Sequence, residues 1–375
     1  MSLPNISQME PWFDDAEASA LHAYMKTGGW VTEFRQTEAF EAALAKFVGA
    51  RHCIATNNGT VALSMALMAV GVGPGDEVIV PDLTMIASPN SAIMIGAKPV
   101  LVDVEARTLN IDAERVAAAI TPRTKAVMHV SYNGRSNDVV ALAEVCRKKG
   151  VALIEDSCQS LGSYARNKAH LGTIGAIGCF SFSLPKIIST GQGGALVTND
   201  DDLHRRLRRL KDFGRSGGGN DIHDVIGYNF KFTDLQAVIG LEQMRKLPWR
   251  LTRKKEIWRR YRDRMAKVPG VVMLETDLDI VSPWFIDVFV RPRAELQAHL
   301  KTLGIGTRIM YPPIHTQQAY ADRRHMKFPV TEDFSPRGLW LPSSAQLTDA
   351  DIDRVCAGVA SFFAAAGAAA GTETH

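Results

Sequence analysis

Two spacings of hydrophobic residues alternate along the first part of the chain. Apolar side chains recur every three or four positions in some segments, which predicts helices, and form short unbroken runs in others, which predicts buried strands. The predicted helices are 14–26, 38–48, 60–70, 84–95, 112–120 and 137–149, the last capped by Asn137. The predicted strands are 53–56, 77–80, 99–102, 125–131 and 151–154. Unbroken apolar strands separated by helices are typical of a mainly parallel sheet covered by helices on both faces.

The pattern changes after about residue 246. A long, highly charged helix is expected at 248–265, followed by a strand at 283–290 and helices at 294–303 and 349–365. We therefore predict an α/β protein with two domains. The large domain covers residues 1–247, and a smaller α+β domain covers residues 248–375.

Composition and charge narrow the class of protein. The chain has 375 residues, 46% of them hydrophobic, so it can bury a sizeable core. The net charge of +3 is small for this length. The basic stretches 203–212 and 253–264 interleave apolar and acidic residues at helical spacing. We interpret both as solvated helix faces and expect no nucleic-acid partner.

The cysteines and the N-terminus indicate where the protein works. The five cysteines are scattered and form no C-x-x-C motif, which favours a reducing compartment without disulfides or a zinc site. The segment MSLPNISQMEPWFDD is too acidic and too weakly apolar for a signal peptide. No run approaches the ~18 apolar residues of a membrane span. We expect a cytoplasmic protein that holds no metal.

The stretch SFSLPKIISTGQGGALVTND encloses one lysine between two apolar runs. A strand is expected to end at residues 181–183, a turn follows at Pro185, and Lys186 precedes a glycine-rich run. A lysine in this setting has the desolvated amine and the space that a Schiff base with pyridoxal phosphate (PLP) requires. Because a lone turn lysine is more often simply solvated, the interpretation depends on its companions.

One companion is TNNGTVAL, residues 56–63, which follows the first predicted strand. Ligands of parallel α/β sheets bind beyond the carboxyl ends of the strands. Gly59 and Thr60 stand where the strand turns into a helix, and free amides at that point suit a phosphate. An ordinary turn capped by Asn58 would explain the same residues.

The second companion is IEDSCQSLG, residues 154–162. PLP needs an anion against its pyridine nitrogen, because the protonated ring is the electron sink of the reaction. Asp156 offers that charge, and Gln159 offers a hydrogen bond to the phenolic oxygen. Asp156 as the cap of a following helix is an equally compatible interpretation.

Taken together, these motifs resemble one family. The order NNGTVAL, EDSCQSLG, FSFSLPK, GQGGALVTND, GYNFKFTDLQAVIGLEQM and GIGTRIMYPPIH is similar to that of the PLP-dependent nucleotide-sugar aminotransferases of the DegT/StrS type. The resemblance extends from Trp30 to about Leu347. It implies fold type I, PLP as cofactor with pyridoxamine phosphate as its intermediate form, L-glutamate as amino donor and a nucleotide-linked keto sugar as acceptor.

The resemblance also assigns roles to the cofactor residues. Lys186 matches the lysine that anchors PLP and moves the proton, Asp156 the partner of the ring nitrogen, and Gln159 the neighbour of the ring oxygen. The phosphate contacts fall on Gly59, Thr60, Ser181 and Asn229. Asn229 matches an asparagine that reaches the phosphate from the other subunit, which implies a homodimer with shared active sites.

For the substrate, the resemblance is less detailed. Tyr311 and His315 fall in the segment that borders the sugar-nucleotide site, and Trp30 falls in a loop near it. Arg308 is a candidate for the diphosphate, although a salt bridge between domains would explain it as well. The segments 81–105 and 304–317 resemble the branch that aminates C4 of GDP-linked 4-keto-6-deoxy sugars. A UDP- or dTDP-linked keto sugar is the alternative.

Two positions depart from the family pattern. Met85 stands where an aromatic residue usually stacks on the cofactor ring, and a thioether covers a ring with less defined geometry. Gln192 replaces the glutamate of a GEGG element. Because neither residue is the base, we expect altered cofactor contacts rather than loss of activity.

Three other functions compete with a transaminase. A PLP-dependent sugar dehydratase of the same fold would carry histidine in place of Lys186. A non-catalytic regulator would not need the lysine, ring acid and phosphate groups together. A nicotinamide-dependent dehydrogenase would need G-x-G-x-x-G after the first strand, which NNGTVAL lacks.

Overall fold

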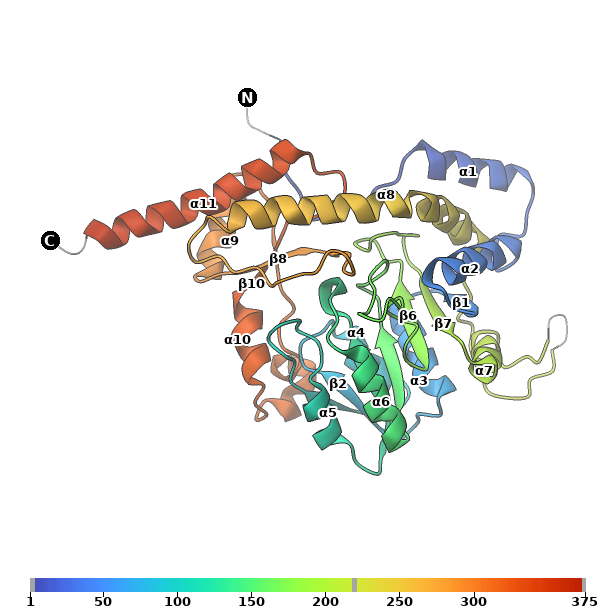
Figure 1. Cartoon of the computed structure of the whole chain (residues 1–375). Coiled ribbons are helices and arrows are strands. Elements are labelled where there is room, and N and C mark those ends of the chain that lie inside the picture. Colours follow the sequence, from blue (N-terminus) through green and yellow to red (C-terminus); the bar gives the residue numbers. More distant parts are fainter. Residues whose placement is uncertain (1–3, 218–220, 373–375) are drawn as a thin grey trace.

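A seven-stranded sheet forms the centre of the computed structural model, which describes residues 4–217 and 221–372 (Figure 1). The strand order is β1-β7-β6-β5-β4-β2-β3. The bounds are β1 His52–Thr56, β2 Glu77–Pro81, β3 Lys98–Val102, β4 Thr124–Val130, β5 Ala152–Asp156, β6 Ile177–Ser181 and β7 Gly194–Thr198. Strands β2 to β6 pair in parallel, and β7 is antiparallel to both of its neighbours. The mainly parallel α/β sheet is confirmed.

The helices of the large domain follow the predicted pattern closely. They are α1 Asp15–Lys26, α2 Arg35–Val48, α3 Gly59–Ala69, α4 Ala87–Ile93, α5 Ala113–Ala119, α6 Val139–Lys149 and α7 Asp201–Lys211, with a 3-10 turn η1 at Tyr132–Gly134. The prediction for 84–95 was too long, because α4 begins only at Ala87. The predicted cap Asn137 was wrong: Asp138 is the N-cap of α6, since its carboxylate accepts from the amide of Ala141.

One long helix, α8 Asp234–Met265, crosses from the large sheet to the C-terminal region. The prediction placed its start at Pro248, but the helix begins where Thr233 caps the amide of Gln236 and continues through Pro248. The helix packs on α1 and α2 at one end and on α11 at the other, and this packing offsets the hydrogen bond that the proline removes. The proposed domain boundary at 247/248 therefore lies inside a continuous helix.

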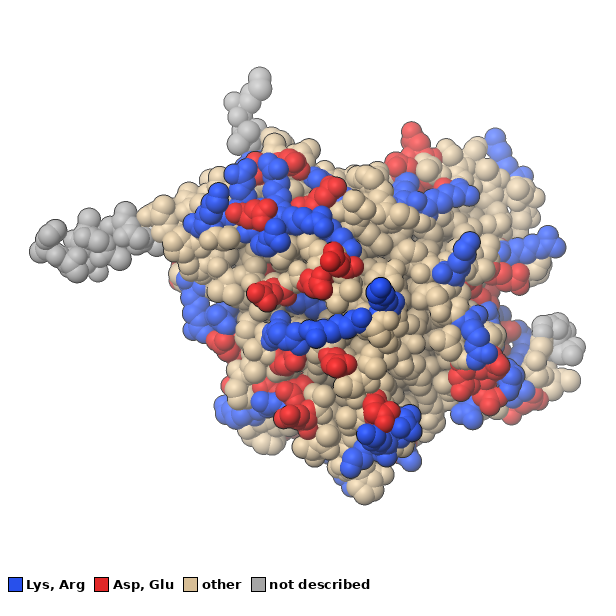
Figure 2. Space-filling view, viewed as in Figure 1, with Lys and Arg blue, Asp and Glu red and all other residues tan. Residues whose placement is uncertain are grey.

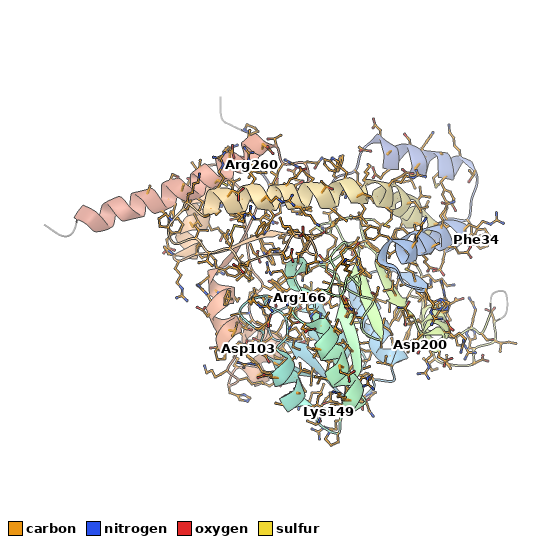
Figure 3. All side chains as sticks on the ribbon, in the orientation of Figure 1. Phe34, Asp103, Lys149, Arg166, Asp200 and Arg260 are labelled. Carbon is orange, nitrogen blue, oxygen red and sulfur yellow. The ribbon has the colours of Figure 1, made fainter. Side chains whose placement is uncertain are left out.

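The C-terminal region is built around a second, small sheet. Its strand order is β8-β10-β9, all antiparallel. The elements are β8 Ile286–Phe289, α9 Arg293–Thr302, β9 Arg308–Ile309, the 3-10 turns η2 Ile314–Thr316 and η3 Gln318–Arg323, α10 Pro329–Arg337, β10 Gly338–Leu341 and α11 Asp349–Thr372. Asp103 (labelled in Figure 3) accepts from the amides of Val330 and Thr331, which fastens the start of α10 beside the end of β3.

Charge is mixed over the face shown in Figure 2. Where α8 meets α11, Arg260 pairs with Asp349 and Asp353, and Arg253 pairs with Asp349. The basic stretch of this helix is thus balanced by acidic partners, as expected for a solvated face. None of the helices within residues 4–217 and 221–372 has both the length and the hydropathy to cross a membrane.

Candidate active site

The predicted motifs meet at one edge of the large sheet. Strands β1, β5 and β6 run in the same direction, because the antiparallel β7 lies between β1 and β6. Their carboxyl ends therefore place the turn after Thr56, Asp156 and Ser181 along that edge. Lys186 follows Ser181 by one short turn, in which its amide donates to the carbonyl of Ser183 at 3.0 Å.

The turn after β1 has the properties of an anion site. Asn58 caps α3 by accepting from the amide of Val61 at 2.9 Å. The amides of Gly59 and Thr60 belong to the first turn of α3, which has no intrahelical acceptors, and the positive end of the helix dipole adds to them. Asn58 is thus the cap that the ordinary interpretation expects. The binding of a phosphate by the amides of Gly59 and Thr60 stays a prediction.

Close packing explains the glycines around this turn. A Cβ atom on Gly59 would lie 2.9 Å from Cβ of Ser181, so the hydroxyl-bearing end of β6 lies directly beside the turn. A Cβ on Gly194 would lie 2.5 Å from the carbonyl of Asn58. The glycine at the start of β7 thus lets that strand pass against the turn and keep it in place.

Asp156 is buried and held by two donors. The hydroxyl of Ser88 donates to its Oδ2 at 2.7 Å, and the amide of Cys158 donates to its Oδ1 at 3.2 Å. Each carboxylate oxygen retains a second lone pair. No helix follows β5 directly, so Asp156 is not the helix cap that the sequence left open. Its position suits a carboxylate that faces a cationic ring nitrogen.

Gln159 lies close to Asp156 and is also buried. Its Oε1 accepts from the backbone N–H of Asn133 at 2.8 Å. Because a backbone N–H only donates, the atom facing it must be the oxygen, and the Nε2 group is left to donate elsewhere. This orientation suits a hydrogen bond to a phenolate oxygen.

The amine of Lys186 lies under an aromatic ring from the segment before β8. Its Nζ is 4.0 Å from the ring centroid of Trp284, and the indole Nε1 of Trp284 donates to the carbonyl of Pro185 at 2.7 Å. Burial lowers the pKa of Lys186, while the positive charge of Arg308 adds to that effect and Asp156 opposes it. A lowered pKa makes the neutral, nucleophilic amine more abundant.

Three contact residues escaped the sequence analysis: Ser88, Asn133 and Trp284. They come from α4, from the turn after β4 and from the segment before β8, which are distant along the chain. Nothing in their local sequence resembles a site motif. The only signal was the pair Trp284–Phe285 just before a predicted strand, and an aromatic pair at that position is typical of a core.

Two of the predicted substrate residues lie near Lys186. Arg308 is exposed on β9, with its guanidinium 5.7 Å from the ring of Tyr311 and 5.6 Å from that of Trp340. Within the described residues Arg308 has no carboxylate partner, which removes the salt-bridge explanation for that part of the chain. Burial raises the pKa of Tyr311 to about 12, so its hydroxyl keeps its proton.

His315 is held in the structure by Asp82. Its Nδ1 lies 2.6 Å from Oδ2 of Asp82, its amide donates to Oδ1 at 2.8 Å, and only 4% of the residue is exposed. Burial raises the pKa of Asp82, although His315 acts in the opposite direction. This pair fastens η2 to the end of β2. Direct contact of His315 with substrate stays a prediction.

The two departures from the family pattern lie at the rim. Met85 follows β2 and is 43% exposed, with its Sδ accepting from the amide of Ala87. Gln192 is exposed, and its carbonyl accepts from Gln236 at 2.7 Å. Neither side chain disturbs the buried groups around Lys186.

Trp30 and Asn229 lie elsewhere in the subunit. They line a surface hollow of about 600 Å³ together with Phe34 and Lys231, and neither lines the two small cavities that Lys186 borders. Trp30 is 65% exposed. The structure therefore does not bring these two predicted residues to Lys186 within one chain.

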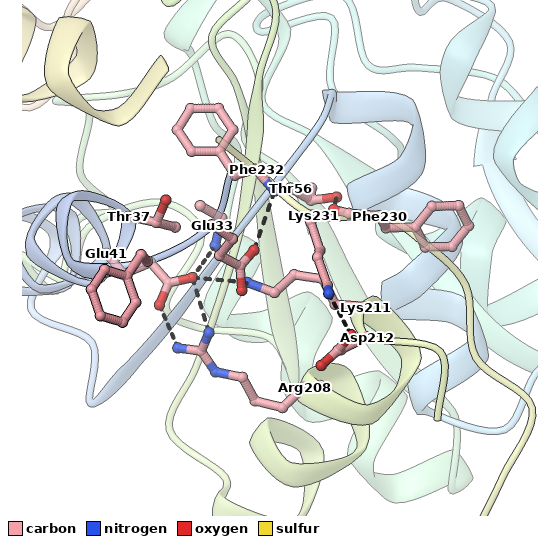
Figure 4. A network of polar contacts seen from close by, with 12 residues as sticks. Glu33, Thr37, Glu41, Thr56, Arg208, Lys211, Asp212, Phe230, Lys231 and Phe232 are labelled. Atoms are coloured by element: carbon pink, nitrogen blue, oxygen red, sulfur yellow. Dashed lines mark hydrogen bonds and ion pairs between the residues drawn. The ribbon is translucent and has the colours of Figure 1, made fainter. Parts of the chain in front are cut away.

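A partly buried polar network lies against the segment that carries Asn229 (Figure 4). Lys211 lies 2.9 Å from Glu33 and 3.2 Å from Glu41, and Arg208 also pairs with Glu41. Thr56, next to the anion-binding turn, donates to the carbonyl of Phe230 at 2.7 Å. The exposed Asn229 is thus fixed on one side of the turn.

The residues at the sheet edge fit PLP. First-turn amides and the Ser181 hydroxyl suit its phosphate, the Asp156 carboxylate its ring nitrogen, the Gln159 donor its ring oxygen, and the Lys186 amine its aldehyde. Each requirement is met by a buried or partly buried group with the correct hydrogen-bonding character.

The chain is similar over most of its length to several known proteins. The chain is 38% identical to GDP-perosamine synthase of Caulobacter vibrioides, covering 95% of this chain and 97% of that protein. It is 33% identical to GDP-perosamine synthase of Vibrio cholerae over 94% and 98% of the two chains. The fold matches the aminotransferase TlmJ from Streptoalloteichus hindustanus with a TM-score of 0.91 and 32% identity, covering 96% and 100% of the two chains.

The match to a family extends over most of the sequence. Residues 13–360 match the DegT/DnrJ/EryC1/StrS aminotransferase family. This range contains every residue assigned above to the cofactor. The protein is an aminotransferase whose cofactor is PLP, and its chain belongs to the DegT/DnrJ/EryC1/StrS aminotransferase family.

Proposed function

We propose that this enzyme transfers the amino group of L-glutamate to C4 of a GDP-linked 4-keto-6-deoxy sugar. With GDP-4-keto-6-deoxymannose as acceptor the product is GDP-perosamine. The observation that carries the proposal is the identity of 38% and 33%, over nearly the whole chain, to two proteins named GDP-perosamine synthase. Aminotransferases for UDP- or dTDP-linked keto sugars remain the competing specificity.

The chemistry of the site supports a nucleotide-sugar acceptor. Arg308 presents an exposed guanidinium above two aromatic rings, a cation suited to a diphosphate. Met85 offers apolar surface near the sheet edge, which favours a sugar whose C6 carries no hydroxyl. Arg308 and Met85 bear on the diphosphate and the sugar. The choice of guanine as the base is supported by the similarity to the two GDP-perosamine synthases.

The roles of the protein groups follow from their surroundings. Bound PLP supplies an electron sink for the carbanion at Cα of the amino donor. Lys186 moves the proton, because its buried amine has a lowered pKa and is neutral more often than an exposed lysine. Asp156 keeps a negative charge at the ring nitrogen, and Gln159 donates to the ring oxygen. Trp284 excludes water from the amine of Lys186.

We further propose a homodimer in which Asn229 completes the site of the neighbouring subunit. Asn229 is exposed and is absent from the lining of the cavity around Lys186 in its own subunit. Apolar side chains crowd the surface near it: Trp30, Phe34, Ile222, Ile226 and Tyr228 are 43% to 80% exposed. Apolar surface of this extent supports contact with a second protein chain.

A cytoplasmic location is part of the proposal. All five cysteines are free, including Cys158 beside Asp156 and Lys186. Free thiols in and around the site are typical of proteins from reducing compartments.

The test is to incubate the protein with PLP, L-glutamate and GDP-4-keto-6-deoxymannose. We expect mass spectrometry to detect a GDP-4-amino sugar, and no product with Lys186→Ala as control. UDP- and dTDP-linked 4-keto-6-deoxyglucose provide the competing substrates. A much higher kcat/KM for one of these would overturn the choice of nucleotide and leave the transaminase intact.

A further inference from the structure

Asn133 lies at the junction between the two domains, in the turn after β4. It is 1% exposed and adopts the left-handed conformation, with φ 54° and ψ 32°. Asparagine is one of the few residues besides glycine that tolerate this conformation. Most other side chains would strain the backbone at this position, whereas asparagine can occupy it and place its amide group there.

The side chain of Asn133 binds one residue of the small domain at both of its polar groups. Its Oδ1 accepts from the amide of Phe285 at 2.5 Å, and its Nδ2 donates to the carbonyl of Phe285 at 2.9 Å. The side-chain amide of Asn133 thus pairs with the backbone N–H and C=O of one residue, as a neighbouring β-strand would. This pairing needs a donor and an acceptor on one short side chain, which an aspartate or an alanine does not provide.

The segment held in this way carries Trp284 to the active site. The ring of Phe285 stacks on that of Trp284 with centroids 3.8 Å apart and planes 18° apart. Trp284 in turn covers the amine of Lys186 at 4.0 Å and binds the carbonyl of Pro185. A continuous set of contacts thus leads from Asn133 to the lysine.

The backbone of Asn133 reaches the same site by a separate route. Its N–H fixes Oε1 of Gln159 at 2.8 Å. Asn133 therefore acts on two neighbours of Lys186. Its side chain determines the position of Trp284, and its main chain determines the orientation of Gln159.

We propose that Asn133 is a positioning residue that holds Trp284 against the amine of Lys186. The inference rests on the proposed role of Lys186 and not on the identity of the substrate. When the amide of Asn133 is absent, the segment at 284–285 loses its anchor and water reaches the amine. The charged and titratable groups that act on Lys186 are Asp156, Cys158 and Arg308, and the substitution replaces none of them.

The test uses the full-length protein freed of cofactor and compares Asn133→Gly with the wild type. Glycine keeps the left-handed backbone and the contact to Gln159 but removes the amide. Acetylation of Lys186 at a series of pH values, read by peptide mass spectrometry, gives the pKa of its amine. We expect the variant's pKa to rise by about one unit as water replaces the ring of Trp284.

Hydrogen exchange at the amide of Phe285 provides a second measurement on the same samples. Loss of its acceptor should speed exchange about tenfold, the factor that corresponds to one hydrogen bond. Asn110→Ala is the matched control. Asn110 is also fully buried, and its Nδ2 donates to the carbonyl of Val130 at 2.7 Å, at the end of β4 and away from Trp284 and Phe285 in the sequence. In this control both readouts should stay at wild-type values.

A second pair of variants keeps the test decisive if Asn133→Gly does not fold. Trp284→Phe shortens the cover over Lys186 and removes its hydrogen bond to Pro185, so it should raise the lysine pKa with Asn133 intact. Asn133→Asp keeps the acceptor and should give a smaller rise. The inference is overturned if the pKa of Lys186 stays at its wild-type value in Asn133→Gly, or in both Trp284→Phe and Asn133→Asp. Failure to aminate a GDP-linked sugar would bear only on the identity of the substrate.

Discussion

At the scale of single residues, the surroundings of the Asp156 carboxylate suit a catalytic role better than a purely structural one. Among residues 4–217 and 221–372, the carboxylate accepts hydrogen bonds from Ser88 and Cys158 alone, although it is buried. A buried carboxylate with unused lone pairs is costly unless a cation or donor completes it. A protonated ring nitrogen supplies that partner.

We predict that Asp156→Asn keeps the shape of the site and loses the charge. Without an anion at the ring nitrogen the carbanion is less stabilised, so kcat should fall by a factor of ~10² or more. Steady-state kinetics with measured PLP content tests this. Ser88→Ala is the matched control, because it removes one donor and keeps the charge, and we expect about a tenfold loss or less. An equal loss of kcat in the two variants would show that the hydrogen bonding of Asp156, and not its charge, supports catalysis.

At the scale of elements, α8 connects the two sheets through a buried lysine. Lys254 lies within this helix, is 3% exposed, and donates to the carbonyl of Ser343 beyond β10 at 2.5 Å. Burial lowers the pKa of Lys254 to about 7. The long helix therefore contacts the segment after β10 through a group whose charge is unfavourable inside the protein.

This lysine should make stability depend on pH. In the unfolded chain Lys254 keeps its ordinary pKa near 10.5, so between pH 7 and about 10 the unfolded state binds more protons than the folded state. The free energy of unfolding should then rise with pH across that window, by up to about 1.4 kcal/mol per unit. The substitution Lys254→Met should remove this contribution to the rise of the free energy of unfolding with pH.

Urea unfolding of wild type and Lys254→Met at several pH values checks the prediction. Subtracting one curve from the other cancels the contributions of other groups, including Lys186. The buried histidines His129 and His170 have pKa values lowered to about 4 by burial, so they titrate outside the window. Parallel slopes for the two proteins would mean that Lys254 stays charged when folded.

At the scale of the whole molecule, the predicted cofactor groups and the exposed Asn229 lie in separate places of the chain. Lys186, Asp156 and Gln159 gather at the sheet edge, while Trp30 and Asn229 line the hollow. The network of Glu33, Glu41, Arg208 and Lys211 fixes the segment of Asn229 without help from a partner (Figure 4). A rigid, exposed asparagine among apolar residues is suited to entering another subunit's site.

Mixing two inactive variants tests this arrangement. Lys186→Ala subunits lack the base, and Asn229→Ala subunits lack the contact donated to a neighbour. In a heterodimer, one of the two composite sites contains an intact Lys186 and an intact Asn229, so part of the activity should return. Mass spectrometry verifies that heterodimers have formed. Verified heterodimers without activity would indicate that Asn229 acts in its own subunit or not at all.

The sequence predicted the chemistry of the cofactor site because each motif is local. Gly59 and Thr60 follow a strand, Asp156 ends one, and Lys186 stands in a turn between two, so strand direction alone brings them to one edge. The same local logic placed most helices and strands. It failed at Asn137, where two adjacent polar residues compete to cap α6, and at Pro248, where packing outweighs a local helix breaker.

The sequence by itself thus determined the α/β sheet and the strand ends and turns at which Gly59, Asp156 and Lys186 stand, since these depend on short-range periodicity. Only the tertiary structure decided what surrounds them. Trp284 over Lys186, Asn133 on Phe285 and the burial of His315 against Asp82 join segments far apart in the chain. Such contacts depend on how the C-terminal region packs on the large sheet, and no local pattern of residues encodes that packing.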